Sequence, residues 1–223
     1  MTPLVRLSGV SKAFAAANGT VAVLQDVSFT INQGQKVSLM GVSGSGKSTI
    51  LALIAGLLRP DSGTVELDGV ALDGLEDAAI ARLRARRIGI ALQSDNLIPF
   101  LTVQENVELA QSFGQRNGSG TGQAQPARSL LDQMGVAHRA GHLPRQTSGG
   151  EAQRVALAVA LANDPALLLA DEMVSQLDKD TAAAVVGAVF DSAMAVLFVT
   201  HDPALAARAE LRLGLQDRSV VAL

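Results

Sequence analysis

The first third of the chain carries the pattern of an antiparallel sheet. Residues 1–35 and 63–72 are rich in β-branched residues, with an Asn-Gly pair at 18–19 and an Asp-Gly pair at 68–69. β-Branched residues favour extended backbone, and such pairs are typical of tight turns between strands. We therefore predict that the two segments form one antiparallel sheet.

A second pattern, short and continuously apolar, recurs along the rest of the chain. Such runs are typical of parallel strands that are buried on both faces. The apolar segment Val37–Met40 leads into a glycine-rich loop and then a helical pattern, Lys47–Leu58, which stops before Pro60. This is a strand, loop and helix unit. The other apolar runs lie at 87–92, 166–170 and 195–200.

Helical spacing replaces the strand signals from about residue 99 to 160. The helical segments there are joined by a polar, glycine-rich stretch at 114–125, a composition typical of a mobile surface loop. We predict that 99–160 form a helical lobe inserted into an α/β core made by 1–98 and 161–223. The whole chain, 1–223, is expected to be a single domain.

The amino-acid composition limits which cellular compartment and which partners are expected. With 223 residues, 48% of them hydrophobic, the chain can bury a substantial core. A net charge of -3 gives no overall attraction to phosphate backbones, so no nucleic-acid partner is expected. The absence of cysteine fits a reducing cytosol. The start of the chain lacks a signal-peptide layout, and no apolar stretch reaches the ~20 residues that span a bilayer. Direct membrane insertion is therefore not expected.

A local basic run interrupts this charge balance. On a predicted helix such a run is either an anion-binding patch or a solvated face, and the solvated face is the commoner case. We interpret the run as a solvated face. It consists of Arg82, Arg84, Arg86 and Arg87.

The loop after Val37–Met40 fits the phosphate-binding pattern G-x-x-x-x-G-K-[ST], the Walker A pattern. Its strand and helix neighbours are those that the mechanism requires, because glycines let backbone N–H groups wrap a polyphosphate at a helix N-terminus. A glycine-rich turn with an incidental lysine is the alternative. The residues predicted to bind ATP here are Gly41, Val42, Ser43, Gly44, Ser45, Gly46, Lys47, Ser48 and Thr49.

Three side chains of this loop have distinct expected roles. Lys47 is predicted to neutralise β- and γ-phosphate oxygens and so to assist catalysis, and Ser48 to give a hydroxyl oxygen to Mg²⁺, which prefers oxygen ligands. Thr49 is expected to hydrogen-bond an α-phosphate oxygen. By itself the loop indicates a bound nucleotide and not which reaction follows.

A pair of carboxylates, Asp171 and Glu172, ends the apolar run ALLLADE. The carboxyl ends of strands in open α/β sheets are where ligand sites collect. Asp171 suits Mg²⁺, bound directly or through water, and Glu172 suits activation of the water that attacks the γ-phosphate. The alternative is an acidic pair that only stabilises a helix N-terminus.

Between these two sites lies SGGEAQR, Ser148–Arg154, and with it the chain closely resembles the ABC (ATP-binding cassette) ATPase family over nearly its whole length. The motifs follow the family's order: an aromatic residue, the phosphate loop, a glutamine after a strand, the signature segment, the acidic strand and a histidine. The resemblance implies a P-loop NTPase: an α/β fold with a RecA-like parallel core, an N-terminal antiparallel β subdomain and an inserted α-helical subdomain.

The resemblance assigns roles to three further side chains. Phe14 matches the aromatic that stacks on adenine, although it could equally be a core residue of the β lobe. Gln93 matches the glutamine that reaches Mg²⁺ and the attacking water. His201 matches the histidine that contacts the γ-phosphate and helps to position the water. The other histidines, His138 and His142, are interpreted as solvated side chains outside the site.

The signature segment in this family contacts ATP held by the opposite subunit of a head-to-tail dimer. Ser148, Gly149 and Gly150 are therefore expected to bind ATP across the interface, where a helix N-terminus offers N–H donors. The segment SQLD, 175–178, resembles the loop across the dimer seam, with Asp178 as the link between the two sites. The dimer is either a homodimer or a heterodimer with a different ATPase.

Four positions depart from the family's usual residues. A leucine usually stands in place of Thr147 and an arginine in place of Val159, while Met173 and Val174 replace a proline and a small hydroxyl residue. None of these changes removes a catalytic group. They change the surroundings of the signature and of the dimer seam.

The resemblance implies an ATP-hydrolysing subunit that powers an ABC transporter by ATP-driven dimer closure, with ATP and Mg²⁺ as cofactors. It would lie on the cytoplasmic side of the membrane, held there by transmembrane permease subunits. The stretch RRIGIALQSDNLIPFLTVQENVELA most resembles ATPases of lipoprotein-releasing and macrolide-exporting systems. The main alternative is a slow or non-hydrolysing regulatory or scaffold subunit of a membrane complex. A second alternative is a soluble ABC ATPase that acts in translation or DNA repair. Such proteins are expected to have tandem cassettes or coiled-coil insertions.

Overall fold

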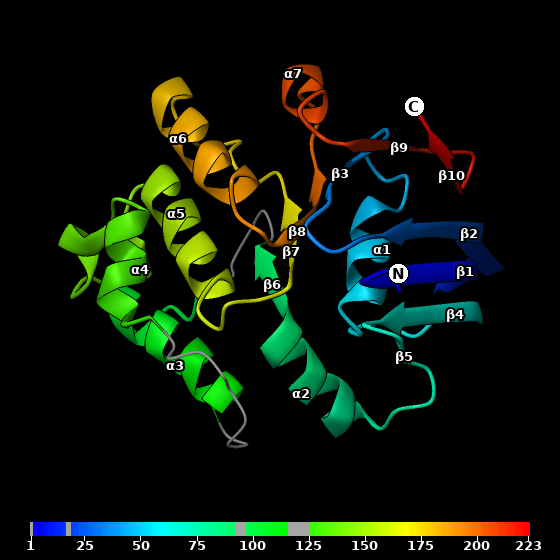
Figure 1. The fold of residues 1–223 in the computed structure, drawn as a ribbon, viewed down its shortest axis with the longest axis horizontal. Coiled ribbons are helices and arrows are strands. Elements are labelled where there is room, and N and C mark those ends of the chain that lie inside the picture. The colour runs from blue at the N-terminus through cyan, green and yellow to red at the C-terminus, as the bar shows by residue number, and fades with distance from the viewer. Residues whose placement is uncertain (1, 17–18, 92–96, 116–124) are drawn as a thin grey trace. The chain divides into compact units, whose positions relative to one another are not determined.

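The computed structural model describes residues 2–16, 19–91, 97–115 and 125–223. The chain forms two compact units (Figure 1). The first unit comprises Met1–Ala81 together with Ala195–Leu223, and the second comprises Arg82–Met194. Each unit combines strands with helices, and each carries part of the chemistry that the sequence predicts.

An antiparallel sheet of the order β2-β1-β4-β5 lies in the first unit, as predicted. The long strands β1 (Val5–Ala16) and β2 (Gly19–Ile31) pair with each other, and β1 also pairs with β4 (Ser62–Leu67). β4 reaches β5 (Val70–Ala71) through the predicted Asp-Gly turn, where both turn residues have positive φ. Such a turn matches the twist of antiparallel strands.

The parallel strands of the first unit surround β3 (Lys36–Met40). β3 lies between β8 (Ala195–Val199) and β9 (Leu211–Gln216), parallel to both, and β10 (Ser219–Ala222) closes the edge antiparallel to β9. β8 is buried along its whole length, which explains its continuous apolar sequence. Leu39 pairs with Val199, so β3 and β8 end at the same edge of the sheet.

Helix α1 (Lys47–Ile54) follows the glycine-rich loop as predicted but ends before Leu58. Gly56 has a φ of 62°, a left-handed conformation that ends many helices. The N–H groups of Gly56 and Leu57 donate to Leu53 and Ala52. A Cβ on Gly56 would lie 2.3 Å from the Ile80 side chain, so glycine is required there. The short helix α7 (Pro203–Ala206) follows β8.

The second unit contains a parallel strand pair and most of the helices. β6 (Ile88–Ala91) pairs with β7 (Leu167–Asp171), with Ala91 opposite Ala170. Helices α3 (Val103–Gln115), α4 (Ala127–Gln133) and α5 (Gly149–Ala160) pack against one another (Figure 1). Two 3₁₀ turns, η1 (Ala137–Arg139) and η2 (Pro144–Gln146), precede α5, and α6 (Lys179–Phe190) follows β7.

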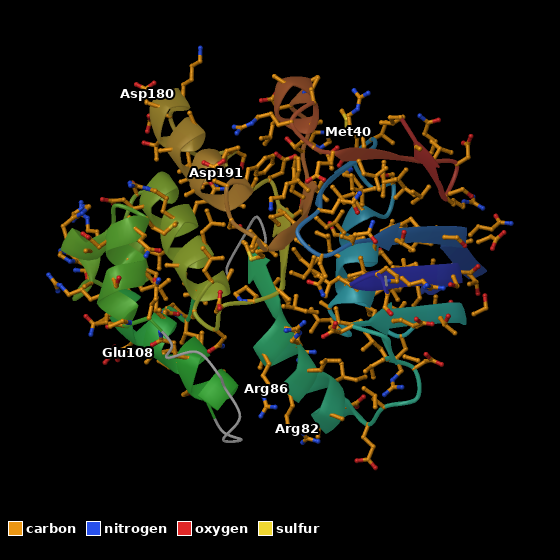
Figure 2. The ribbon with its side chains drawn as sticks, viewed as in Figure 1. Met40, Arg82, Arg86, Glu108, Asp180 and Asp191 are labelled. Atoms are coloured by element: carbon orange, nitrogen blue, oxygen red, sulfur yellow. The ribbon has the colours of Figure 1, made fainter. Side chains whose placement is uncertain are left out.

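The basic run lies on α2 (Asp77–Arg87), whose last six residues belong to the second unit. Figure 2 shows the side chains of Arg82 and Arg86 on the outer side of this helix. Arg82 is exposed, whereas Arg84, Arg86 and Arg87 are half-buried and the Nε atom of Arg87 is buried, so a fully solvated face describes Arg82 alone.

The predicted helical lobe, 99–160, falls within the second unit, and its boundaries remain a prediction. α3 continues to Gln115, so the first two residues of the predicted loop at 114–125 are helical. Residues 116–124 of that loop lie outside the described residues.

Candidate functional site

The phosphate-binding pattern forms the connection from β3 to α1 in the first unit. Met40 is the last residue of β3 (Figure 2), and Gly46 is the N-cap of α1. Gly46 has a φ of 111°, and a Cβ there would lie 2.8 Å from a methyl group of Val23 on β2. The loop therefore needs a glycine at this position, and it packs closely against β2 of the antiparallel sheet. Val42, Ser43 and Gly44 are exposed.

Lys47 is the first residue of α1 and is only 7% exposed. Its Nζ atom donates to the carbonyl oxygens of Gly41, at 2.9 Å, and Val42, at 2.8 Å. A buried ammonium group is costly unless it is paired or hydrogen-bonded. The loop thus holds a positive charge at its centre, at a helix N-terminus that itself favours anions.

The remaining side chains of the loop differ in exposure. Ser48 is exposed, whereas Ser45 and Thr49 are half-buried. The Ser45 hydroxyl oxygen would lie 2.9 Å from a Cβ on Gly41, so the loop folds tightly upon itself. Ser48 is therefore within reach of a ligand from solvent.

His201 lies in the same unit as the phosphate loop. It follows β8 after the buried Thr200, and its side chain is exposed. The Thr200 hydroxyl accepts a hydrogen bond from the N–H of Asp202 at 3.0 Å, which shapes the turn after the strand. Because β3 and β8 are neighbouring parallel strands, the phosphate loop and His201 both follow the carboxyl ends of adjacent strands.

Phe14 is exposed, so the alternative of a core residue is wrong. Its side chain is 39% exposed and it pairs across the strands with Val21, which is 53% exposed. The Nζ atom of Lys12 lies 5.7 Å from the centre of the Phe14 ring, within the range of a cation–π contact. The ring is accessible for stacking.

The acidic pair lies in the second unit at the end of β7. Asp171 is the last residue of the strand, and Glu172 has a φ of 53°, which is uncommon for a residue other than glycine. Gln93 follows β6, the neighbour of β7, but lies outside the described residues. The structure therefore gives no position for the predicted glutamine.

Ser148 is the N-cap of α5, so the signature segment forms the start of this helix. Its hydroxyl accepts from the N–H of Glu151 at 3.2 Å, and the Glu151 carboxylate accepts from the N–H of Ser148 at 2.8 Å. This reciprocal arrangement is a capping box. Ser148 and Gly149 remain exposed, so the helix N-terminus is accessible.

A pocket of about 510 Å³ opens beside this helix N-terminus. Residues of the signature segment and of the SQLD segment line it, so the structure brings together two motifs whose lining residues are at least 22 positions apart in sequence. The residues that line it are Ser148, Gly149, Gly150, Glu151, Arg154, Gln176, Leu177, Asp178 and Thr181.

Two basic side chains of η1 contact the Glu151 carboxylate. The Arg139 Nε atom donates to a Glu151 carboxylate oxygen at 2.9 Å, and the His138 Nε2 atom lies 3.1 Å from the same oxygen. The His138 side chain is 59% exposed, as expected of a solvated residue, and its contact is with Glu151 of the signature helix. The bond from the Ser148 N–H, followed by that from Arg139, lowers the pKa of Glu151 from its ordinary value of 4.5 to about 2.

We expect Glu151→Ala to lower the free energy of unfolding at pH 7 by about 1–2 kcal/mol, because the Glu151 carboxylate no longer accepts from the Ser148 N–H and from Arg139. The pKa of Glu151 is depressed in the folded state, so its contribution is present above about pH 4.5 and is lost as the pH falls toward about 2. Denaturant unfolding of the wild type and the variant from pH 7 to pH ~3 should therefore give a difference that shrinks below pH ~4.5.

Glu108→Ala is the matched control, since Glu108 is exposed on α3 and accepts a hydrogen bond from Gln104 four residues away. Such pairs contribute only about 0.2–0.5 kcal/mol. A Glu151 effect no larger than that of the control, or one that grows as the pH falls, would contradict this role.

Asp178 has a structural role in addition to the predicted one. Its carboxylate accepts from the N–H of Thr181 at 3.0 Å and caps the N-terminus of α6. Hydrogen bonds from Thr181 lower the pKa of Asp178. The charge of Asp178 is therefore fixed at the edge of the pocket.

Glu151 and Gln153 were not predicted as parts of the site. The spacing S-x-x-E, Ser148 to Glu151, is a sequence signal of a capping box, and Glu151 could have been predicted from it. Gln153 donates from α5 to the carbonyl oxygen of Glu172 at 2.6 Å, a contact between residues 19 positions apart that no local pattern indicates.

Comparison with known proteins identifies the family. The sequence model of the family described as ABC transporter matches residues 24–175, which is more than half of the chain. The chain belongs to this family and is an ATP-binding cassette ATPase. The matched range includes the phosphate loop, Gln93, the signature and the acidic pair, whereas Phe14, Asp178 and His201 lie outside it.

Two curated relatives lie in the branch that the sequence resembles. The lipoprotein-releasing system ATP-binding protein LolD of Shewanella denitrificans is 39% identical over 97% of this chain and 94% of its own length. The macrolide export ATP-binding/permease protein MacB of Rhodospirillum rubrum is 38% identical over 98% of this chain. The chain spans only 34% of the length of that MacB protein.

A solved structure of the ATP-binding cassette MJ0796, a dimer in a post-hydrolysis state bound to ADP and Pi, matches with a TM-score of 0.89. The two chains are 36% identical, and the match covers 97% of this chain and 96% of the other. It confirms the predicted α/β P-loop NTPase fold and the assignment of the chain as an ATPase cassette.

Proposed function

We propose that this chain is the ATP-hydrolysing subunit of a transport complex in which two ATPase chains close on bound ATP and a separate membrane partner carries the cargo. The observation that carries the proposal is the pair of accessible helix N-termini, one at Lys47 and one at Ser148. Either helix N-terminus can bind phosphate groups. Each chain then offers two half-sites.

The first half-site is the phosphate loop. Its backbone N–H groups and Lys47 bind the β- and γ-phosphates, and Thr49 binds an α-phosphate oxygen. The Lys47 ammonium is held by two carbonyl groups of the loop itself, which are weak partners for a cation compared with a phosphate. A triphosphate can therefore replace them.

The residues proposed for Mg²⁺ fit this ion. Ser48 offers a hydroxyl oxygen, Asp171 a carboxylate and Gln93 an amide oxygen. Mg²⁺ prefers oxygen ligands, and it usually takes a few of them from the protein and the rest from phosphate and water. The exposed position of Ser48 directly after Lys47 supports its part in this set. When bound, Mg²⁺ would neutralise negative charge on the phosphates.

Hydrolysis is assigned to Glu172 with His201 and Gln93. Glu172 accepts a proton from the attacking water, and His201 donates to the γ-phosphate and keeps the water in line. The place of His201 after β8, the strand next to β3, supports this assignment, because the phosphate loop begins at the end of β3.

The second half-site is the signature segment, which binds ATP of the opposite chain. Ser148 supplies a hydroxyl group and the N-terminus of α5 supplies N–H groups, while the capping box keeps the helix start in place. The dimeric form of MJ0796 with ADP and Pi supports a two-chain arrangement. Asp178, on the pocket beside Ser148, is proposed to link the two sites.

The membrane partner is proposed to contact the helical lobe near Gln93, on the cytoplasmic side of the membrane. Phe100, seven residues after Gln93, has a side chain that is 78% exposed and is therefore available for contact with a partner. None of the helices described in the structure is long and apolar enough to cross a bilayer. We propose that permease subunits supply the path for the cargo.

A slow or non-hydrolysing regulatory subunit is the competing function. Release of phosphate from ATP separates the two: the motor subunit hydrolyses ATP at a rate that Glu172→Gln removes. If the wild type and Glu172→Gln are equally inactive together with the co-purified membrane protein, the regulatory function replaces the proposed one.

Stacking of adenine on Phe14 gives a separate prediction. Phe14→Ala should weaken ATP binding by about 5-fold or more, since base stacking on an aromatic ring contributes about 1–3 kcal/mol. Binding of inorganic tripolyphosphate, which has no base, should not change. Isothermal titration calorimetry with both ligands measures this difference.

Phe113→Ala is the control, because Phe113 is also exposed, at 53%, but lies on α3. Equal losses of ATP and tripolyphosphate binding in Phe14→Ala, or no loss of either, would rule out the stacking role.

A further inference from the structure

Gln153 of the signature helix uses both ends of its side-chain amide in the acidic-pair region. Its Nε2 atom donates to the carbonyl oxygen of Glu172 at 2.6 Å, and its Oε1 atom accepts from the N–H of Gln176 at 3.1 Å. The side chain is half-buried. One amide therefore connects α5 to both ends of the turn that follows β7.

The backbone of Glu172 is the strained part of that turn. Its φ of 53° places a side chain other than glycine in the left-handed region, at a cost of about 1–3 kcal/mol. The N–H and hydroxyl of Ser175 also donate to the Glu172 carbonyl, at 3.1 and 3.0 Å. Those donors belong to the same turn, whereas Gln153 reaches it from a different element.

The orientation of the Glu172 carboxylate depends on this backbone conformation. A change of φ toward ordinary values would rotate the Cα–Cβ bond and move the carboxylate by more than an ångström. General-base catalysis requires the base within hydrogen-bond distance of the proton that it accepts. A contact that fixes the Glu172 carbonyl therefore also fixes its catalytic side chain.

We propose that Gln153 is a positioning residue for ATP hydrolysis, holding Glu172 in its left-handed conformation. By accepting from Gln176, it also sets the start of the SQLD segment relative to the signature helix. The inference rests on the proposed function, in which Glu172 activates the water. It adds a role for a side chain that itself does not touch the nucleotide.

The chemistry of the contact requires an amide. Glutamine offers a donor to the Glu172 carbonyl and an acceptor to the Gln176 N–H at the same time. Methionine has a similar length but no donor, and an ionised glutamate has only acceptors, one of which would face the Glu172 carbonyl oxygen. Both replacements should therefore release the turn.

The test compares steady-state ATP hydrolysis by Gln153→Met and Gln153→Glu with that of the wild type. We expect kcat to fall about 10- to 100-fold, because a displacement of about 1 Å in a catalytic group has effects of this size. The KM for ATP and the dissociation constant of ATP should change by less than about 3-fold, because the phosphate loop is intact. Gln133→Met, the same change on the exposed face of α4, should have no effect.

A second comparison separates positioning from a general structural role. In a Glu172→Gln background, where the carboxylate is already absent, Gln153→Met should cause no further loss of the residual rate. Thermal unfolding checks that each variant is folded, and Gln153→Glu serves if Gln153→Met does not fold.

Three outcomes decide the matter. Wild-type kcat in a folded Gln153 variant overturns the inference, and so does an equal further loss in the Glu172→Gln background. Loss of kcat only where Glu172 is present supports it. Failure of the proposed function is distinguishable, because the wild type itself would then show no hydrolysis above Glu172→Gln.

Discussion

Lys47→Ala should lower kcat/KM for ATP by about 100- to 1000-fold, the loss expected when one preorganised charged donor to the phosphates is removed. Lys47 is buried within the loop at a helix N-terminus, with its ammonium group on two loop carbonyls. Alanine keeps α1, since it is a good helix former, but removes the only side-chain cation of the loop sequence GVSGSGKST. The loss should therefore appear in nucleotide binding as well as in turnover.

Phosphate release and calorimetric ATP binding measure the Lys47 effect. Lys179→Ala, on the exposed first turn of α6, is the matched control and should bind and hydrolyse ATP like the wild type. If Lys47→Ala binds ATP with unchanged affinity, the loop does not bind phosphate in the way inferred from its geometry.

Glu172→Gln should lower kcat by about 100- to 10,000-fold, the range of a general base, and leave ATP binding intact. Glutamine has nearly the same shape as glutamate, so the left-handed backbone and the bonds to the Glu172 carbonyl persist. What is lost is the proton acceptor. The two variants are thus expected to differ: Lys47→Ala binds ATP more weakly than the wild type, and Glu172→Gln binds it normally but hydrolyses it slowly.

Single-turnover hydrolysis together with equilibrium binding of ATP distinguishes these two kinds of loss. Glu108→Gln repeats the chemical change on the exposed face of α3 and should leave both quantities unchanged. Hydrolysis by Glu172→Gln at more than a tenth of the wild-type rate would assign the general base to another group.

The phosphate loop was predictable because its signals are local. An apolar strand, a run of glycines and a helix start lie next to one another in sequence, and β3, the loop and α1 follow in that order. The end of α1 was missed although its signal is local as well. Gly56 takes the left-handed conformation that ends many helices, whereas the apolar pattern continues to Leu58.

The contacts that other segments make with the signature helix could not be predicted from the sequence, because they join residues that are distant along the chain. His138 and Arg139 bond to Glu151 across a turn, and Gln153 bonds to Glu172 across 19 residues. Histidine, arginine and glutamine are common on exposed faces, so their presence alone gives no signal. Their roles follow only from the packing of α5 against the strands and turns around it.

The departures from the usual family residues are accommodated locally. Met173, which replaces the usual proline, is 2% exposed and packs in the interior of the second unit. The hydroxyl of Thr147 donates to the Pro144 carbonyl at 2.6 Å and closes the turn before the signature. Neither residue takes the place of Ser148, Asp171 or Glu172, so the proposed chemistry of the chain is retained.

The central claim is that one nucleotide site needs two chains, and the molar mass of Glu172→Gln in solution tests it most directly. Light scattering in saturating ATP and Mg²⁺ should give twice the 23.0 kDa of a single chain, because ATP bound at the phosphate loop also binds the signature segment of the partner. The same variant in ADP should remain a monomer, as should the double variant Glu172→Gln, Ser148→Arg in ATP. A mass of 23.0 kDa for Glu172→Gln in ATP would contradict the two-chain site.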